Sequence, residues 1–356
     1  MMRSRLTVIM RGIAIAMTMA LGACVDNATE FLGQSDPVDF NAVVAPTSNV
    51  VSRTIISDLN YPDNQPFVAY ASWLGEGKNW DTDKAESKVF INGDKVAFNT
   101  YLTDKWTTET AYYWPDVGSL TFAAYSPCIE TLSSKFSYNH TTGNLTISDW
   151  DVANEKDVDL MVADVQKNLT SEIAASGVPV AFRHKLALVA FNAGLIQDYI
   201  EGGTTYHLYL QKVELRKVKT KGNYSSASDS WSGQYEEETV VIYENPTPSD
   251  YSKGYDVTTD ISQHISEPTL VMPQVHLEAD NESQAHIYIK WYDSKTDKIE
   301  DQSVNIRKKI TDSHWAINNS YTYLLLWERG TPTYIEFTTP EVGAWDNGGN
   351  YPITID

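Results

Sequence analysis

Hydrophobic and polar residues alternate in short runs along most of this chain. In the run from His286 to Tyr292, Ile287, Ile289 and Trp291 share one face, and the other face is polar or amphipathic. A period of two is typical of a half-buried antiparallel strand. Similar runs predict further strands at residues 120–124, 145–147, 206–218, 239–243, 321–327, 334–338 and 351–355.

One of these runs changes phase. Within residues 206–218 the apolar positions move from Leu208 and Leu210 to Val213 and Leu215, which predicts a bulge or a sharp bend. Long helical periodicity is nearly absent, and the segment 165–175 is the one short helix that the pattern predicts.

Residues 181–193 fit either a helix or a strand, and their alternation favours a strand. The stretch Ser176-Gly177-Val178-Pro179 is the best candidate for a domain boundary, because strand-rich sequence of similar length lies on both sides. We therefore predict an all-β protein with one domain over residues 54–176 and a second over residues 177–356.

The N-terminus has the features of an export signal. Arg3, Arg5 and Arg11 are followed by an apolar run that ends in Leu21-Gly22-Ala23-Cys24. Small residues before a cysteine predict a bacterial lipoprotein, with residues 1–23 removed and Cys24 lipidated. The alternative is an ordinary secretory signal with an incidental cysteine. The apolar run is shorter than the about 20 residues that span a membrane.

Residues 24–53 predict a tether with one embedded strand at 38–44, because the rest of the segment is small, polar or proline. The full chain carries a net charge of −20. Removal of residues 1–23 leaves 24 basic and 47 acidic residues. Such an acidic surface repels nucleic-acid phosphates and anionic lipid headgroups, so neither is expected as a partner.

Lipidation of Cys24 would leave Cys128 as the remaining cysteine, so no intramolecular disulfide is expected. A nucleophilic role for Cys128 is one interpretation, and a small buried hydrophobic residue is the favoured one. The sequence contains no Gly-x-Ser-x-Gly elbow, phosphate-binding glycine loop or cysteine pair. His276 and His286 lack the spacing of metal ligands, and His184 among apolar neighbours predicts a core histidine.

Two acidic segments are candidate calcium sites. Asp293, Asp297, Glu300 and Asp301 form one, and the turn 346–350 forms the other. Neither follows the spacing of a calcium loop, and turns of Asp, Asn and Gly are common without metal. We predict no catalytic residue, no metal and no cofactor.

Several landmarks together resemble the fimbrillin family, the Mfa-like and FimA-like lipoproteins of Bacteroidetes. They stand in the same order behind the lipoprotein signal, at residues 113–115, 120–127, 178–187, 270–274, 286–292, 335–337 and 342–345. The resemblance implies two tandem transthyretin-like antiparallel β-sandwich domains and a role in surface fimbriae. It also implies passage to the outer membrane as a lipoprotein, which polymerising members follow with cleavage after an arginine.

That cleavage would remove the first strand and expose a groove, which a donor strand of another fimbrial subunit would fill. Arg53 is a candidate processing site, because no other arginine lies between Cys24 and Arg183, and cleavage would leave Thr54 as the new amino terminus. The alternative is an ordinary charged residue at a strand edge.

The last residues contain a candidate donor strand, in which Tyr351, Ile353 and Ile355 alternate with polar residues and Pro352. The alternative is the last strand of this chain's own sandwich, at an edge because of Pro352. The sequence thus predicts a non-catalytic fimbrial subunit or adhesin, with a host, bacterial or glycan ligand as a candidate partner. The competing hypothesis is a glycan-binding surface lipoprotein, whose sugar-stacking candidates are Trp73, Trp80, Trp106, Trp231 and Tyr235.

Overall fold

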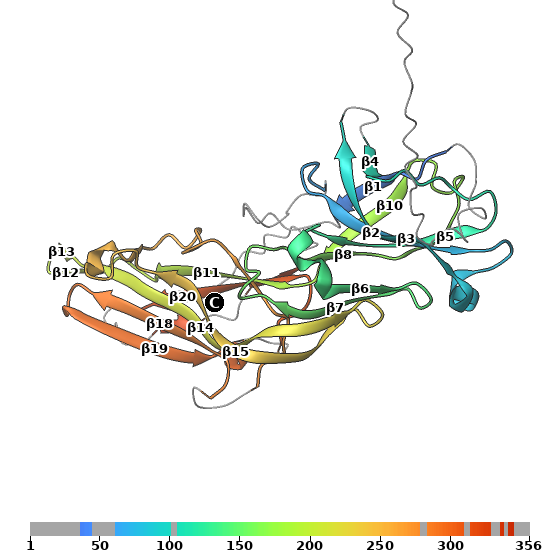
Figure 1. The fold of residues 1–356 in the computed structure, drawn as a ribbon. Helices are drawn as coiled ribbons and strands as arrows, with labels where there is room; N and C mark the ends of the chain where they lie inside the picture. Colours follow the sequence, from blue (N-terminus) through green and yellow to red (C-terminus); the bar gives the residue numbers. More distant parts are fainter. Residues whose placement is uncertain are drawn as a thin grey trace, which may run out of the picture.

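The structure, a computed structural model, describes residues 36–44, 61–100, 105–277, 283–309, 314–328, 335–337 and 341–344. In this part of the chain nearly all regular structure is strand, and the molecule is elongated (Figure 1). The predicted all-β class is confirmed. The helical segments are short: α1 (Trp80–Asp83), η1 (Lys84–Glu86), η2 (Glu130–Lys135), η3 (Tyr251–Lys253) and η4 (Ile306–Lys309).

One end of the molecule is an eight-stranded sheet. Its order is β2 (Phe67–Leu74), β3 (Lys88–Asn99), β4 (Lys105–Thr108), β1 (Phe40–Val44), β10 (Val178–His184), β8 (Met161–Ala163), β5 (Ser119–Ser126) and β9 (Gln166–Leu169). Because β2 also pairs with β5, the strands from β2 round to β5 form a closed ring, with β9 beside β5. Its interior holds the aromatic residues Phe67, Phe122 and Phe182.

The other end contains two sheets. The first consists of β19 (Lys298–Asn305), β18 (His286–Asp293), β14 (Leu208–Ser225), β7 (Asn144–Asp151) and β6 (Phe136–Asn139), with β15 (Ser230–Glu244) and β16 (Tyr255–Val257) paired to β14. The second consists of β17 (Thr269–Val271), β11 (Ala187–Leu195), β20 (Asn319–Trp327), β21 (Ile335–Phe337) and β22 (Glu341–Ala344). A core that includes Phe191, Trp291 and Trp327 lies between them. A small hairpin joins β12 (Ile200–Glu201) to β13 (Thr204–Thr205).

The two ends share a third apolar cluster. Tyr70 and Tyr125, from the closed ring, pack with Trp150 of β7 and Trp231 of β15. The long strand β14 pairs with β18 at its start and with β7 at its end, so one hairpin connects both regions. This shared cluster fixes the two ends against each other.

The alternation in the sequence predicted these strands well. Most predicted runs within the described residues are strands, and β14 shifts register between Val213 and Glu214, where the phase change predicted a bulge. The strand favoured for 181–193 is confirmed but divided, because β10 ends at His184 and β11 begins at Ala187. His286 lies next to Ile287 in β18 and therefore on the opposite face, as predicted, but it is buried.

The helix predicted at residues 165–175 is wrong. Residues Gln166–Leu169 form β9 against β5, and turns follow. The backbone of Asn168 has a φ of 54°, and its N–H donates to Thr121 Oγ1 at 3.2 Å. These contacts with β5 outweigh a weak local preference for helix.

The eight-stranded sheet extends beyond the boundary predicted at 176 and 177, because β10 pairs with β1 and β8. The chain enters another sheet first at β6 and β7, returns for β8 to β10, and from Ala187 onwards all described strands belong to the other sheets. The division into two transthyretin-like domains stays a prediction. Over the described residues, no helix has the length and apolar character needed to cross a membrane.

Candidate functional site

The candidate site is the place that β1 occupies in the closed ring. β1 runs parallel to β10, with Phe40 opposite Val178 and Val44 opposite Phe182. On its other side Phe40 lies opposite Trp106 of β4 in an antiparallel pair. A strand from the N-terminal region is therefore inserted between two strands that come later in the sequence.

The residues just before β1 are also held by backbone hydrogen bonds. The Val38 N–H donates to the Tyr112 carbonyl oxygen at 2.8 Å, and the Trp114 N–H donates to the Asp36 carbonyl oxygen at 3.2 Å. The strand predicted at 38–44 is thus confirmed, as an extended lead-in followed by β1.

Alternate side chains of this segment fill the interior of the ring. Val38, Phe40, Ala42 and Val44 are between 2% and 8% exposed, whereas Val43 is 39% exposed. The Phe40 ring contacts Phe67 and Phe122 edge to face, both at 5.9 Å between centroids. Each large apolar side chain buried in this way contributes about 1.5–3 kcal/mol, so the segment stabilises the ring substantially.

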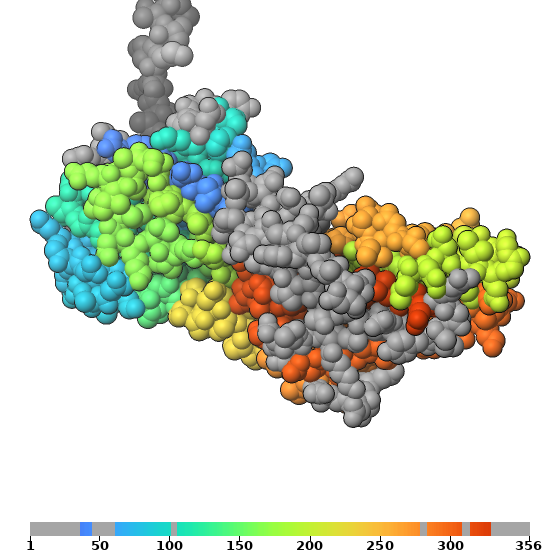
Figure 2. All heavy atoms as spheres, turned by 180° about the vertical axis from the view of Figure 1, so that it is seen from behind, coloured from blue at the N-terminus to red at the C-terminus, as the bar shows by residue number. Residues whose placement is uncertain are grey.

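One ion pair fixes the segment at its edge. The carboxylate of Asp39 pairs with Lys105 of β4, and the Asp39 carbonyl oxygen accepts from the Val178 N–H at 2.8 Å. Figure 2 shows that parts of residues 36–44, in blue, reach the molecular surface. The side chains on one face of β1 are therefore buried in the ring, whereas those on its other face are accessible to solvent.

The space between β4 and β10 is suited to binding an extended segment. Without β1, β10 would lose its parallel partner, and the core around Phe67, Phe122 and Phe182 would be open to solvent. An incoming strand with apolar residues at every second position would restore the ladder and fill the same holes.

Comparison with known proteins identifies the family of this chain. The sequence profile of the fimbrillin-like family matches residues 64–345. The chain belongs to the fimbrillin-like family. No curated protein matches it.

Solved structures share the fold of this fimbrillin-like chain. A fimbrial protein from Bacteroides vulgatus is 15% identical, with a TM-score of 0.56 over 86% of this chain and 100% of that one. A putative cell adhesion protein from Bacteroides uniformis is 14% identical, with a TM-score of 0.51 over 87% of this chain and 99% of that one. At these identities the likeness concerns the fold alone.

The residues predicted for lipidation, processing and strand donation lie outside the described residues. They are Cys24, Arg53, Thr54, Tyr351, Ile353 and Ile355. The candidate calcium turn at 346–350 lies outside them as well. These assignments stay predictions.

One constellation in the fimbrillin-like chain has the residue types of a hydrolase. Ser72 Oγ lies 2.9 Å from His140 Nδ1, and His140 Nε2 lies 3.2 Å from Asn92 Oδ1. Burial lowers the pKa of His140. Ser72, however, has no exposed surface and also donates to the His140 carbonyl oxygen at 3.2 Å. No substrate reaches such a hydroxyl, so the group holds β2 against the β6–β7 turn.

Other predicted polar sites have structural roles. Buried His184 lies 2.8 Å from Asp159 Oδ1, as expected of a core histidine. Asp293 accepts from the Lys295 N–H and from Thr296 Oγ1, both at 2.9 Å, and so closes the β18–β19 turn. Among the described residues, no three His, Cys, Asp or Glu side chains gather closely enough to hold a metal ion.

Cys128 is a free, partly buried thiol. Burial raises the pKa of this thiol, Lys95 lowers it to a smaller extent, and Glu109 and Glu130 raise it. A raised pKa keeps the thiol protonated at neutral pH, which opposes a nucleophilic role.

The proposed sugar-stacking tryptophans are largely buried. Trp80, Trp106 and Trp231 are between 2% and 8% exposed, so their ring faces are covered by protein. The indole N–H of Trp73 donates to the Val117 carbonyl oxygen at 3.0 Å. Tyr235 is exposed and donates to Asp149 Oδ1 at 2.8 Å. The glycan-binding hypothesis therefore loses most of its candidate residues.

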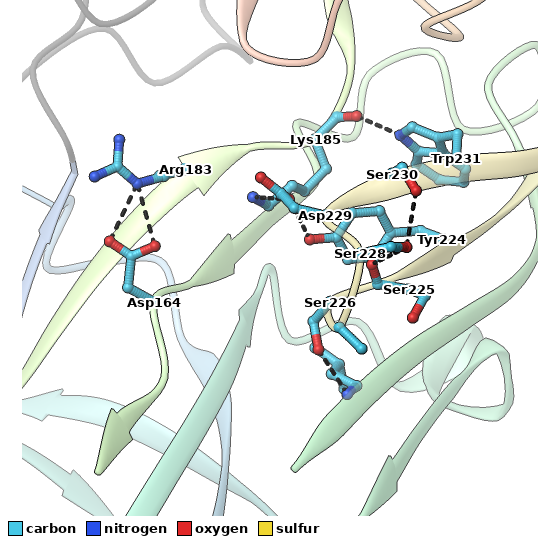
Figure 3. A network of polar contacts seen from close by, with 12 residues as sticks. Asp164, Arg183, Lys185, Tyr224, Ser225, Ser226, Ser228, Asp229, Ser230 and Trp231 are labelled. Atoms are coloured by element: carbon cyan, nitrogen blue, oxygen red, sulfur yellow. Dashed lines mark hydrogen bonds and ion pairs between the residues drawn. The ribbon is translucent and has the colours of Figure 1, made fainter. Parts of the chain in front are cut away.

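A polar network that no sequence pattern predicts lies where the two ends meet (Figure 3). The buried Lys185 ammonium lies 2.8 Å from Asp229 Oδ1, which also accepts from the Tyr224 hydroxyl at 2.7 Å. The Trp231 indole N–H donates to the Lys185 carbonyl oxygen at 2.6 Å. These four residues come from separate strands and loops, so no local sequence motif predicts that they meet.

Proposed function

We propose that this fimbrillin-like protein is a subunit of a surface fimbrium, joined to its neighbours by strand addition at the place now occupied by β1. The observation that carries the proposal is the position of β1 between β4 and β10, with Val38, Phe40, Ala42 and Val44 filling the ring interior. A removable first strand in a closed sheet supports exchange with an equivalent strand.

Cleavage after Arg53 is the proposed trigger. Arg53 follows β1 in the sequence, so cleavage there would detach β1 from the rest of the chain and leave Thr54 at the amino terminus. The region that matches the family begins at residue 64, beyond both β1 and Arg53. Cleavage alone does not remove β1, because its buried side chains and hydrogen bonds still hold it. The donor strand must therefore displace β1.

The C-terminal segment of a neighbouring subunit is the proposed donor. Tyr351, Ile353 and Ile355 follow one another at every second residue, as Phe40, Ala42 and Val44 do in β1. An aromatic residue followed by two aliphatic residues therefore reproduces the order of the side chains that β1 inserts. In this register Ile353 takes the place of Ala42, and the ring must accommodate three more carbon atoms there.

Export places the protein at the cell surface. The lipid on Cys24 would hold the precursor at the outer membrane until cleavage releases it, or permanently in an anchoring subunit. The fimbrial family supports a surface location and a structural role without catalysis. The buried Ser72 hydroxyl supports the same conclusion, since the most hydrolase-like group of the described residues is closed to substrate.

Mass spectrometry of the amino terminus on intact cells tests the proposal. We expect wild-type protein to begin at Thr54 and to form oligomers that persist in detergent until boiled. Arg53→Ala should retain acylated Cys24 and remain monomeric. Arg307→Ala, which removes an arginine from η4 and not from the surroundings of β1, should be processed as wild type. Exclusively acylated Cys24 in the wild type would contradict strand removal and would instead describe an anchor or a solitary surface lipoprotein.

A further inference from the structure

A row of aromatic side chains crosses the outward face of the sheet that contains β14. Tyr209 of β14 lies opposite Tyr292 of β18 on one side and opposite Asp256 of β16 on the other. Residues opposite one another in a sheet point to the same face. The neighbouring positions Leu208 and Leu210 are buried in the core, so this row faces outward.

The rings of this row are nearly parallel. His207 and Tyr209 lie 5.5 Å apart with planes 15° from parallel, and Tyr209 and Tyr292 lie 6.5 Å apart at 16°. Tyr251 of η3 adds a third tyrosine, 5.3 Å from Tyr292 at 33°. Tyr251 is 43% exposed. We call His207, Tyr209, Tyr292 and Tyr251 the tyrosine row.

Carboxylates border the tyrosine row. Asp256 Oδ1 lies 3.2 Å from His207 Nδ1, and the Tyr292 hydroxyl donates to Asp297 Oδ1 at 2.9 Å. Burial raises the pKa of Tyr209, and the nearby carboxylates of Asp256 and Asp250 raise it further. The electrostatic potential at the rings is therefore negative.

Two other tyrosine sites in the same half of the molecule already hold a cation. The guanidinium carbon of Arg216 lies 3.5 Å from the ring centre of Tyr288, and Arg216 Nε donates to Glu214 at 2.7 Å. The Lys295 ammonium lies 5.8 Å from the Tyr199 ring and 5.9 Å from the Tyr206 ring. Over the described residues, no lysine or arginine makes such a contact with the tyrosine row.

We propose that the tyrosine row binds an arginine side chain from a basic segment of a partner protein. The planar guanidinium stacks on tyrosine rings, and its fork of N–H groups matches the bordering carboxylates, as Arg216, Tyr288 and Glu214 already do within this chain. A neutral sugar would gain less from the negative potential. The strongly acidic chain also favours a basic partner over an acidic one.

The position of the tyrosine row leaves it accessible to a partner protein. Figure 1 shows the beginning of β14 and the end of β18 at the far end of the molecule from β1. The tyrosine row therefore stays accessible whichever strand occupies the place of β1. The inference goes beyond the proposed function and does not depend on strand exchange.

Binding of the full-length protein to an immobilised peptide of four Gly-Arg repeats, measured by surface plasmon resonance, tests the proposal. We expect Tyr251→Leu and Tyr292→Leu to weaken binding about tenfold, which is within the range for cation–π contacts. Neither variant changes the net charge, so general attraction to the acidic protein is unaltered. Tyr235→Leu is the matched control, since Tyr235 is also exposed and bonded to a carboxylate, and it should bind as wild type.

A peptide in which citrulline replaces arginine keeps the shape but lacks the charge, and it should not bind. Equal binding by wild type, Tyr251→Leu and Tyr292→Leu would overturn the proposal, because it would assign the attraction to net charge alone. Binding of a neutral oligosaccharide that is lost in Tyr251→Leu, with arginine-peptide binding retained, would also overturn it in favour of a glycan site. Tyr251 lies in an exposed turn, so an unchanged unfolding midpoint in this variant keeps the test valid.

Discussion

Gly177 lies so close to Phe40 that a side chain at position 177 would push its neighbours aside by a few tenths of an ångström. A Cβ on Gly177 would stand 3.1 Å from the Phe40 carbonyl carbon and 3.0 Å from Asp39 Oδ1. The φ of Gly177 is +96°, a conformation that favours glycine. The position directly before β10 therefore favours glycine, both for its backbone conformation and for the close approach of β1.

We expect Gly177→Ala to destabilise the uncleaved protein by about 1–3 kcal/mol more than Gly203→Ala, because the added methyl group overpacks against β1. Gly203 is the matched control, since its φ of +82° is close to that of Gly177 and nothing lies within 4 Å of its Cβ position. Urea unfolding gives both values. In protein that begins at Thr54 and lacks β1, the difference between the two variants should disappear. Its persistence would mean that the contact with β1 is not the cause.

Phe40→Ala should destabilise the protein by about 3–5 kcal/mol, as expected when a large aromatic side chain leaves a cavity. Val43→Ala tests the same strand on its outward side, where the side chain is 39% exposed, and should change stability by no more than about 0.5 kcal/mol. Denaturant midpoints at constant slope provide the comparison. A similar effect of the two changes would show that β1 contributes little through its inward face.

Alternation along the sequence predicted the strands because a period of two depends only on neighbouring residues. It did not predict which strands pair. The partnership of Phe40 with Val178 joins residues far apart in the sequence, and nothing in either local pattern specifies it. Likewise Val165 and Leu169 have helical spacing, yet Leu169 is buried beside Leu120 in a strand.

The candidate site was predicted in part for the same reason. The sequence predicted the strand at 38–44 and its position before a candidate cleavage site. Its place between β4 and β10 could be known only from the structure. The sequence pattern predicted exposed tryptophan rings wrongly, because polar neighbours in the sequence do not indicate which residues cover a ring in the folded protein. Trp80 lies in a polar helix, yet it is 2% exposed. The tyrosine row was missed because its members come from three separate elements.

Asp229→Asn should destabilise the junction of the two ends by about 1 kcal/mol, since the exposed side of Asp229 limits the strength of its pair with buried Lys185. Asp164→Asn, which breaks the more exposed Arg183 pair, should have a smaller effect. Burial favours the protonated form of Asp229, but the hydrogen bonds from Lys185 and Tyr224 outweigh it and lower its pKa.

Because the folded pKa of Asp229 is lowered, its contribution is complete above the ordinary value of about 3.9 and is lost as the pH falls through the folded pKa. The stability difference between wild type and Asp229→Asn should therefore shrink on acidification below that value. Urea unfolding at a series of pH values measures it. A difference that stays constant down to strongly acidic pH would argue against the ion pair.

His276 predicts a second, separate acid sensitivity. Its imidazole stands edge-on to Trp315 at 4.3 Å, and burial, with a smaller effect of His314, lowers its pKa to about 3. Between that value and the ordinary histidine pKa of about 6.5, the unfolded chain binds a proton that the folded chain does not. Stability should therefore decline as the pH falls from about 6.5 towards 3. His276→Phe, which keeps an aromatic ring beside Trp315, should reduce the decline in this window and leave stability at pH 8 changed only by packing. Equal slopes of unfolding free energy against pH in wild type and His276→Phe would show that His276 is not the group that titrates.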